Sequence, residues 1–157
     1  MRITQWGEFG LHCSMQLARR EREGVTTVGA AEIADEQEIA LDYTQQILQR
    51  LRKGGIIESV RGPHGGYRLS RPAASITLGE ILKASEGNTF EVICETKPLN
   101  EERCAPEMNC NLRHLWLELR DHVNTFLTNR SLLDILDYQA PASSETPVQI
   151  GKRVGQP

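Results

Sequence analysis

The sequence predicts a mainly α-helical fold that contains one small β-hairpin. Apolar residues recur at helical spacing in several segments of the chain. Two short β-prone runs flank a loop of glycine and proline, which is typical of a hairpin. A length of 157 residues, of which 39% are hydrophobic, suffices for one domain with an added element.

Three helices are expected in the first third of the chain. Residues 4–22 predict the first helix, with Thr4 as its N-cap. Its inward face comprises Trp6, Gly10, Cys13, Leu17 and Ala18. Residues 28–39 predict a short second helix, and residues 41–55 predict a longer third helix that ends at a glycine pair. The inward positions of these two helices are Ala31, Ile33, Ala34, Thr44, Ile47, Leu48 and Leu51.

A hairpin is expected next, because the loop "RGPHGG" separates the β-prone runs "IIESV" and "YRLSRP". The order helix, short helix, long helix, hairpin is that of a winged helix-turn-helix. The segment "TLGEILKASEG" then predicts an amphipathic helix over residues 77–87. A capping box of Thr77 and Glu80 is expected to open it.

A long helix is expected from about 110 to 129. Its apolar residues are Leu112, Leu115, Trp116, Leu119, Val123, Phe126 and Leu127. This apolar stripe packs either on its own domain or on the same helix of a second copy. We predict the second arrangement, a homodimer. The domains are then a winged helix-turn-helix at 1–88, a cysteine loop at 89–110, a dimerisation helix and short helix at 111–138, and a disordered tail at 139–157.

Charge is distributed unevenly along the chain. The net charge of −3 argues by itself against nucleic acid binding. Residues 50–71, however, carry a net charge of +5, whereas residues 79–107 carry −4. A basic patch on an acidic protein points to phosphate binding, although a solvated charged face is the simpler alternative.

In a helix-turn-helix motif the second helix lies in the DNA major groove, and here that helix is the one expected at residues 41–55. Glutamine can pair with both N6 and N7 of adenine, so Gln45 and Gln46 are candidates for base contacts, with Asp42 and Tyr43 beside them. Phosphate contacts are expected from Arg50, Arg52 and Lys53. The hairpin loop can place Arg61 or His64 in a flanking minor groove.

Three of the four cysteines lie in an acidic, proline-broken segment. The N-terminus lacks the apolar run of a secretory signal and no segment is apolar enough to span a membrane, so we expect a cytoplasmic protein with reduced thiols. Gaps of nine and five residues separate Cys94, Cys104 and Cys110. This spacing differs from the close pairs of zinc fingers and suits an iron–sulfur cluster. Cys110 also falls at a predicted helix N-terminus, which favours a thiolate.

Residues alone leave the fourth ligand open among Cys13, Glu8, His114 and His122. The segments "LDYTQQILQRLRKGGIIESVRGPHGGYRLSRP" and "CNLRHLW" resemble the Rrf-two family of bacterial winged-helix regulators, and the resemblance runs from "MRIT" to about Leu136. It implies a homodimer that binds a pseudo-palindromic double-stranded DNA operator. It also implies an iron–sulfur cluster on Cys94, Cys104 and Cys110.

Members of this family differ in the fourth ligand, and some bind no cluster. IscR-like members have a histidine three residues after the last cysteine, where this chain has Arg113. NsrR-like members use an acidic residue near the N-terminus that reaches across the dimer, and Glu8 occupies that place. The resemblance therefore favours Glu8. A 4Fe–4S cluster is favoured, and the long first gap keeps 2Fe–2S as an alternative.

We therefore expect a transcriptional repressor that senses redox state, nitric oxide or iron–sulfur status. Two alternatives stay open: a winged-helix regulator with a cluster-free thiol or zinc switch, and an enzyme with a catalytic cysteine. The enzyme is disfavoured, because the DNA-binding and dimer elements use up nearly the whole chain.

Overall fold

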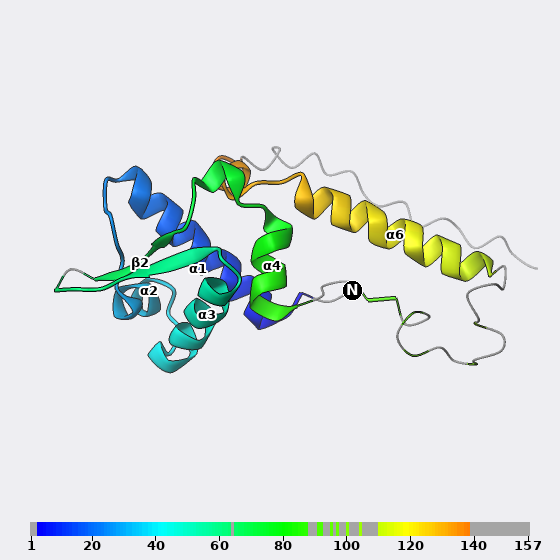
Figure 1. The fold of residues 1–157 in the computed structure, drawn as a ribbon, viewed down its shortest axis with the longest axis horizontal. Coiled ribbons are helices and arrows are strands. Elements are labelled where there is room, and N and C mark those ends of the chain that lie inside the picture. The colour runs from blue at the N-terminus through cyan, green and yellow to red at the C-terminus, as the bar shows by residue number, and fades with distance from the viewer. Residues whose placement is uncertain are drawn as a thin grey trace, which may run out of the picture.

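A computed structural model describes residues 3–63, 65–87, 91, 92, 95, 97, 100, 104 and 110–138. His64, Cys94 and the expected tail at 139–157 lie outside the described residues. The elements are α1 (Gln5–Arg22), α2 (Ala30–Glu36), α3 (Leu41–Lys53), β1 (Ile57–Val60), β2 (Gly66–Leu69), η1 (Ala73–Ser75), α4 (Leu78–Glu86), α6 (Asn111–Thr128) and α7 (Leu132–Leu136). The mainly α fold with one antiparallel hairpin is confirmed, and Figure 1 shows the arrangement.

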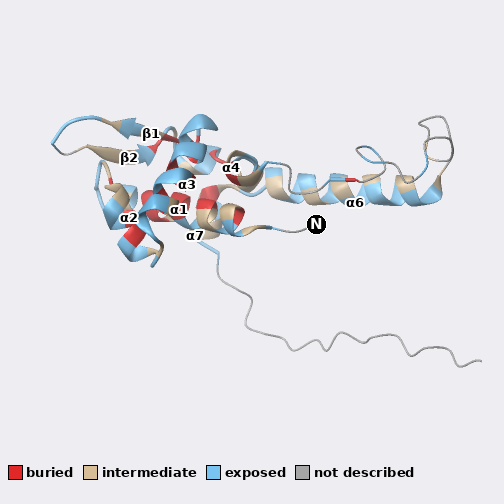
Figure 2. Ribbon diagram, turned by 90° about the horizontal axis from the view of Figure 1, so that it is seen from below, coloured by how far each residue is buried: buried red, intermediate tan, exposed pale blue. Residues whose placement is uncertain are grey.

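The core lies among α1, α2, α3 and α4, and α7 closes one side of it. Figure 2 shows that the buried residues concentrate in this part of the molecule. The inward residues predicted for α3, which are Thr44, Ile47, Leu48 and Leu51, are all buried. Ala31 was predicted to point inward and is exposed instead. The face of α2 is turned so that Ala30, Ile33 and Ala34 contact the core at helical spacing.

The wing is anchored to the α1–α2 connection. Strands β1 and β2 pair with Ile57 opposite Leu69 and Val60 opposite Gly66. Val28 extends this pairing, because its N–H and C=O each form a 2.9 Å hydrogen bond with the backbone of Tyr67. A Cβ atom at Gly66 would lie 2.6 Å from the Val28 carbonyl oxygen, so only glycine allows this approach.

The long helix α6 is attached to the core only near its own C-terminal end, within the described residues. There, Leu78 N–H donates to the Arg130 carbonyl (2.9 Å), and Leu132 N–H donates to the Ile76 carbonyl (2.7 Å). The N-terminal end of α6 lies far from the core in both ribbon views (Figures 1 and 2). None of its residues is buried. Within the described part of the chain, we find no helix with the length and apolar character needed to cross a membrane.

Candidate nucleic-acid interface and metal centre

The outward face of α3 is polar and hollowed. A shallow depression is lined by Asp42, Gln45, Gln46, Gln49, Arg52 and Tyr67. The structure thus brings together Gln45, Gln46 and Arg52, which the sequence predicted as DNA contacts, and adds Tyr67 from the wing. Gln49 was missed, although its spacing of three and four residues from Gln46 and Gln45 could have indicated it. This surface offers several amide groups that can both donate and accept hydrogen bonds.

Tyr43 does not share this outward face. Its ring centroid lies 4.5 Å from that of Trp6 and 5.8 Å from that of Phe9, with the second pair edge to face. The side chain is half-buried, because the ring covers apolar surface between α1 and α3. The Tyr43 ring therefore packs between α1 and α3.

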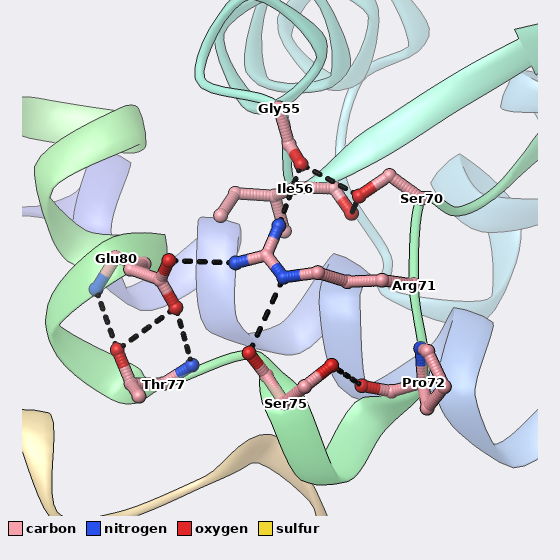
Figure 3. Close-up of polar contacts among 8 residues, drawn as sticks. All are labelled: Gly55, Ile56, Ser70, Arg71, Pro72, Ser75, Thr77 and Glu80. Carbon is pink, nitrogen blue, oxygen red and sulfur yellow. Dashed lines mark hydrogen bonds and ion pairs between the residues drawn. The ribbon is translucent and has the colours of Figure 1, made fainter.

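The basic patch predicted from charge counts is largely occupied by contacts within the protein. Arg68 Nε lies 2.6 Å from Glu58 Oε1 across the hairpin. Arg71 contacts Glu80, Gly55 and Ser75, as Figure 3 shows. The guanidinium of Arg50 lies 4.0 Å from the Trp6 ring centroid, and its Nη1 donates to the Ser85 carbonyl. Three of the predicted basic residues are exposed and, among the described residues, form no ion pair or cation–π contact. They are Arg52, Lys53 and Arg61.

Two of the three loop cysteines are described, and both suit coordination. Cys104 and Cys110 are half-buried free thiols. Cys110 is the N-cap residue of α6, and its side chain makes no capping hydrogen bond. The Cys110 side chain therefore does not cap the helix at whose N-terminus it lies. Cys94, the third predicted ligand, lies outside the described residues, but its neighbour Glu95 is held 2.7 Å from Arg120 Nη1 on α6.

The candidates for a fourth ligand occupy different environments. Cys13 is fully buried, and burial raises the pKa of its thiol from 9.0 to about 12, which disfavours the thiolate that a metal needs. Glu8 is exposed in the first turn of α1, and its Oε1 lies 3.5 Å from His12 Nε2. His12 was not predicted as part of this group, although its spacing of four residues from Glu8 could have indicated it.

His114 and His122 are exposed on α6, and His122 lies 3.8 Å from Glu118. Glu8 and Cys110 belong to distant parts of the fold. The start of α1 lies against the end of α4, where Thr4 N–H donates to Glu86 Oε2 (2.8 Å), whereas Cys110 precedes the far end of α6. Among the residues that the structure describes, no three metal-ligating side chains meet at one point.

Comparison with known proteins resolves the family. A family model described as "Rrf2: Iron-dependent Transcriptional regulator" matches residues 3–138. The chain belongs to the Rrf2 family. This Rrf2 protein is therefore a transcriptional regulator and not an enzyme.

Relatives and solved structures agree with this assignment. The chain is 33% identical to the HTH-type transcriptional regulator IscR of Xenorhabdus nematophila over 156 residues, covering 94% of this chain and 92% of that protein. It is 32% identical to IscR of Yersinia pestis over 139 residues, covering 88% and 81%. The fold is similar to CymR, the global cysteine regulator of B. subtilis, with TM-score 0.72, 28% identity and coverage of 89% and 99%. It is also similar to T. potens IscR, with TM-score 0.67, 25% identity and coverage of 87% of each chain.

Proposed function

We propose that the protein is a homodimeric repressor whose affinity for its DNA operator depends on an iron–sulfur cluster held by Cys94, Cys104, Cys110 and Glu8. The observation that carries this proposal is the free Cys110 thiol at the N-cap of α6, with a second free thiol at Cys104 in the same loop. A 4Fe–4S cluster is favoured, with 2Fe–2S as the alternative.

The exposed apolar stripe of α6 supports dimerisation. Its large side chains are 42% to 62% exposed, which is unusual for a helix of an isolated domain. The residues are Leu112, Leu115, Trp116, Leu119 and Phe126. One edge of the helix beside this stripe is partly covered by its own chain, because Leu127 lies against Gly79 and Arg120 pairs with Glu95. The uncovered stripe therefore suits a second copy of the same helix.

A dimer through α6 would also explain why Glu8 and Cys110 are far apart in one chain. A helix of 18 residues is about 27 Å long, so its N-terminal end can reach the winged-helix core of the other protomer. Glu8 of the partner subunit would then complete the site of this chain. Its carboxylate is exposed and, among the described residues, pairs only loosely with His12, so it is available as a ligand.

DNA binding would follow from the two α3 helices of the dimer. Gln45 and Gln46 would contact base edges in the major groove, Arg52 and Lys53 would contact phosphates, and Arg61 or His64 would enter a flanking minor groove. Half-sites of such operators lie one helical turn or a multiple apart, so a change in the spacing of the α3 helices changes affinity.

When bound, a cluster with one carboxylate ligand supplies an iron site that is more open to oxidants, to nitric oxide or to loss than an all-thiolate site. Glu8 would connect α1 of one protomer to the cysteine loop of the other. Loss of this ligand would release the connection and let the two α3 helices shift. A coupling of about 1–3 kcal/mol would be enough for a useful switch.

Purification without oxygen tests the cluster. We expect coloured protein that contains iron and acid-labile sulfide, and we expect Glu8→Ala to lose the cluster faster in air than wild type. Glu21→Ala is the matched control, because Glu21 is an exposed carboxylate on the same helix. Colourless wild-type protein with zinc or no metal would contradict the proposal.

The alternative is a cluster-free thiol switch. It is supported by the similarity to the oxidised form of Staphylococcus aureus CymR, with TM-score 0.66, 31% identity and coverage of 90% and 100%. Colourless protein whose DNA affinity changes with thiol oxidation would favour this alternative.

A further inference from the structure

Three helices meet at one guanidinium, that of Arg50. Its Cζ lies 4.0 Å from the centroid of the Trp6 ring on α1. Its Nη1 donates a 2.8 Å hydrogen bond to the Ser85 carbonyl near the end of α4. Arg50 itself lies in the last turn of α3. Both the charged hydrogen bond and the cation–π contact favour this placement of the guanidinium between α1 and α4.

Next to the Arg50 guanidinium, the end of α4 is hydrogen-bonded to the start of α1. The Glu86 carboxylate accepts hydrogen bonds from the N–H and the hydroxyl of Thr4, the N-cap residue of α1. A Cβ atom at Gly7 would lie 2.9 Å from Glu86 Cδ, and one at Gly10 would lie 1.9 Å from Ser85 Oγ. The two helix ends therefore touch through glycine and cannot separate without losing these hydrogen bonds.

These two helix ends are also the parts of the chain nearest in sequence to the proposed sensor. Glu8 lies two residues after Trp6, and the cysteine loop begins shortly after Glu86. Trp6 in turn contacts Tyr43 in the first turn of α3. Both ends of the recognition helix α3 are thus connected to the first turns of α1, through Tyr43 at one end and Arg50 at the other.

We propose that Arg50 is a positioning residue that couples the state of the cysteine and Glu8 site to the orientation of α3. This inference rests on the proposed function. A displacement of the first turn of α1 moves Trp6 and the end of α4, and both are direct partners of the Arg50 guanidinium. The sequence predicted Arg50 as a phosphate contact, and the two roles differ in a measurable way.

The contrast between Arg50 and Arg52 separates the two roles. Arg52 lines the polar depression on α3 and donates a 3.4 Å hydrogen bond to Ser59 Oγ on the wing. The logarithm of the DNA association constant falls linearly with the logarithm of the salt concentration. Each arginine that contacts a phosphate makes this slope steeper by about 0.9. A positioning residue leaves that slope unchanged and alters the ratio of affinities between the cluster-loaded and cluster-free protein.

The experiment uses a duplex selected by the wild-type dimer from a randomised library. Kd is measured by fluorescence anisotropy at several salt concentrations for cluster-loaded and cluster-free protein. In Arg50→Ala we expect the Kd values of the cluster-loaded and cluster-free protein to differ by less than about twofold, with an unchanged salt slope. Arg52→Ala is expected to lower the slope by about 0.9 and to keep the ratio.

Arg50→Lys keeps the charge but not the planar group that stacks on Trp6 and directs Nη1, so we expect it to behave like Arg50→Ala in the ratio. Hydrogen exchange of the cluster-free protein gives a second readout without DNA. Arg50→Ala should exchange faster than wild type at the end of α4 and the start of α1, whereas Arg52→Ala should not.

The outcomes distinguish the two proposals. If wild-type protein shows no difference between its cluster-loaded and cluster-free forms, the proposed function fails and this inference fails with it. If wild type shows the difference and Arg50→Ala keeps the same ratio and the same exchange pattern, the positioning role of Arg50 is overturned while the proposed function stands.

Discussion

Arg71 Nη2 lies 2.6 Å from Glu80 Oε1, which joins the segment after the wing to the first turn of α4. The same guanidinium donates to the Gly55 carbonyl (2.9 Å) and the Ser75 carbonyl (3.2 Å), as Figure 3 shows. Gly55 follows the end of α3 and has a φ of +71°, which favours glycine. Arg71 thus connects the end of α3, the segment after the wing and the first turn of α4.

Arg71→Ala should therefore destabilise the protein. The change leaves the Gly55 and Ser75 carbonyls without their charged donor, and we expect a loss of about 1–3 kcal/mol in the free energy of unfolding. Urea denaturation followed by circular dichroism measures it. Arg61→Ala is the control, because Arg61 is exposed near the wing tip and should cost less than about 0.5 kcal/mol. Equal losses for the two variants would contradict the structural role of Arg71.

Glu80 should make stability depend on pH on the acid side. The Thr77 backbone N–H, followed by the Thr77 hydroxyl and Arg71, holds the pKa of Glu80 below its ordinary value of 4.5. A carboxylate with a lowered pKa adds stability that is complete above the ordinary value and is lost as pH falls through the folded value. Glu80→Gln keeps an oxygen for the capping box but removes the charge.

We expect the Tm of wild type to exceed that of Glu80→Gln by a constant amount between about pH 7 and about pH 5, and the difference to shrink below 4.5. Thermal melts across this range provide the measurement. A difference that persists unchanged down to about pH 3 would show that the charge of Glu80 is not what stabilises the capping box.

The cysteines should differ sharply in reactivity. Cys13 is buried and its thiol has a pKa of about 12, whereas Cys104 and Cys110 are half-buried. In the native cluster-free protein at about pH 8, iodoacetamide should label Cys104 and Cys110 and should reach Cys13 only after denaturation. Peptide mass spectrometry reads the sites. Labelling of Cys13 at the rate of Cys110 would contradict its burial in the core.

The apolar stripe of α6 should control self-association. Leu115→Asp together with Leu119→Asp places two charges on the exposed stripe, and neither residue is part of the folded core. Sedimentation velocity should show a dimer for wild type and a monomer for the double variant, with the circular dichroism of the winged-helix core retained. Glu118→Ala is the control on the same helix, because Glu118 is exposed but lies beside the stripe. If the double variant still sediments as a dimer, the apolar stripe of α6 is not the dimer interface.

Gln45 should affect selectivity more than general affinity. We expect Gln45→Ala to lose about 1–3 kcal/mol of discrimination between the selected duplex and one with its half-site adenines replaced, because a bidentate contact is lost. Competition anisotropy with the two duplexes measures this difference. A weakening that is equal on every sequence would instead indicate a phosphate contact.

Local patterns predicted most of the fold. Thr44, Ile47, Leu48 and Leu51 recur at helical spacing and are all buried, and the Thr77–Glu80 capping box forms as expected. Thr4 occupies the predicted N-cap, but its side chain contacts Glu86 instead of the helix N–H groups. This partner lies 82 residues away in the chain, so no local pattern could indicate it.

The candidate site was predicted less completely for the same reason. A count of charges treats Arg50, Arg68 and Arg71 alike, whereas each has partners set by tertiary packing. The Ser85 carbonyl that holds Arg50 is a backbone group 35 residues away, and backbone acceptors have no sequence signature. Tyr43 was placed outward by its position on α3, but the apolar surface of Trp6 and Phe9 draws its ring inward.

The anchoring of the wing at Val28 and Gly66 has a consequence for the shape of the DNA that can be bound. Because strand β2 of the hairpin is hydrogen-bonded through Tyr67 to Val28 in the α1–α2 connection, the wing keeps a nearly fixed distance from α3. A duplex that contacts both elements has to adjust the width of its own grooves to this distance. Base pairs between the two contacts, which no side chain touches, would then influence binding through the ease with which they bend or narrow.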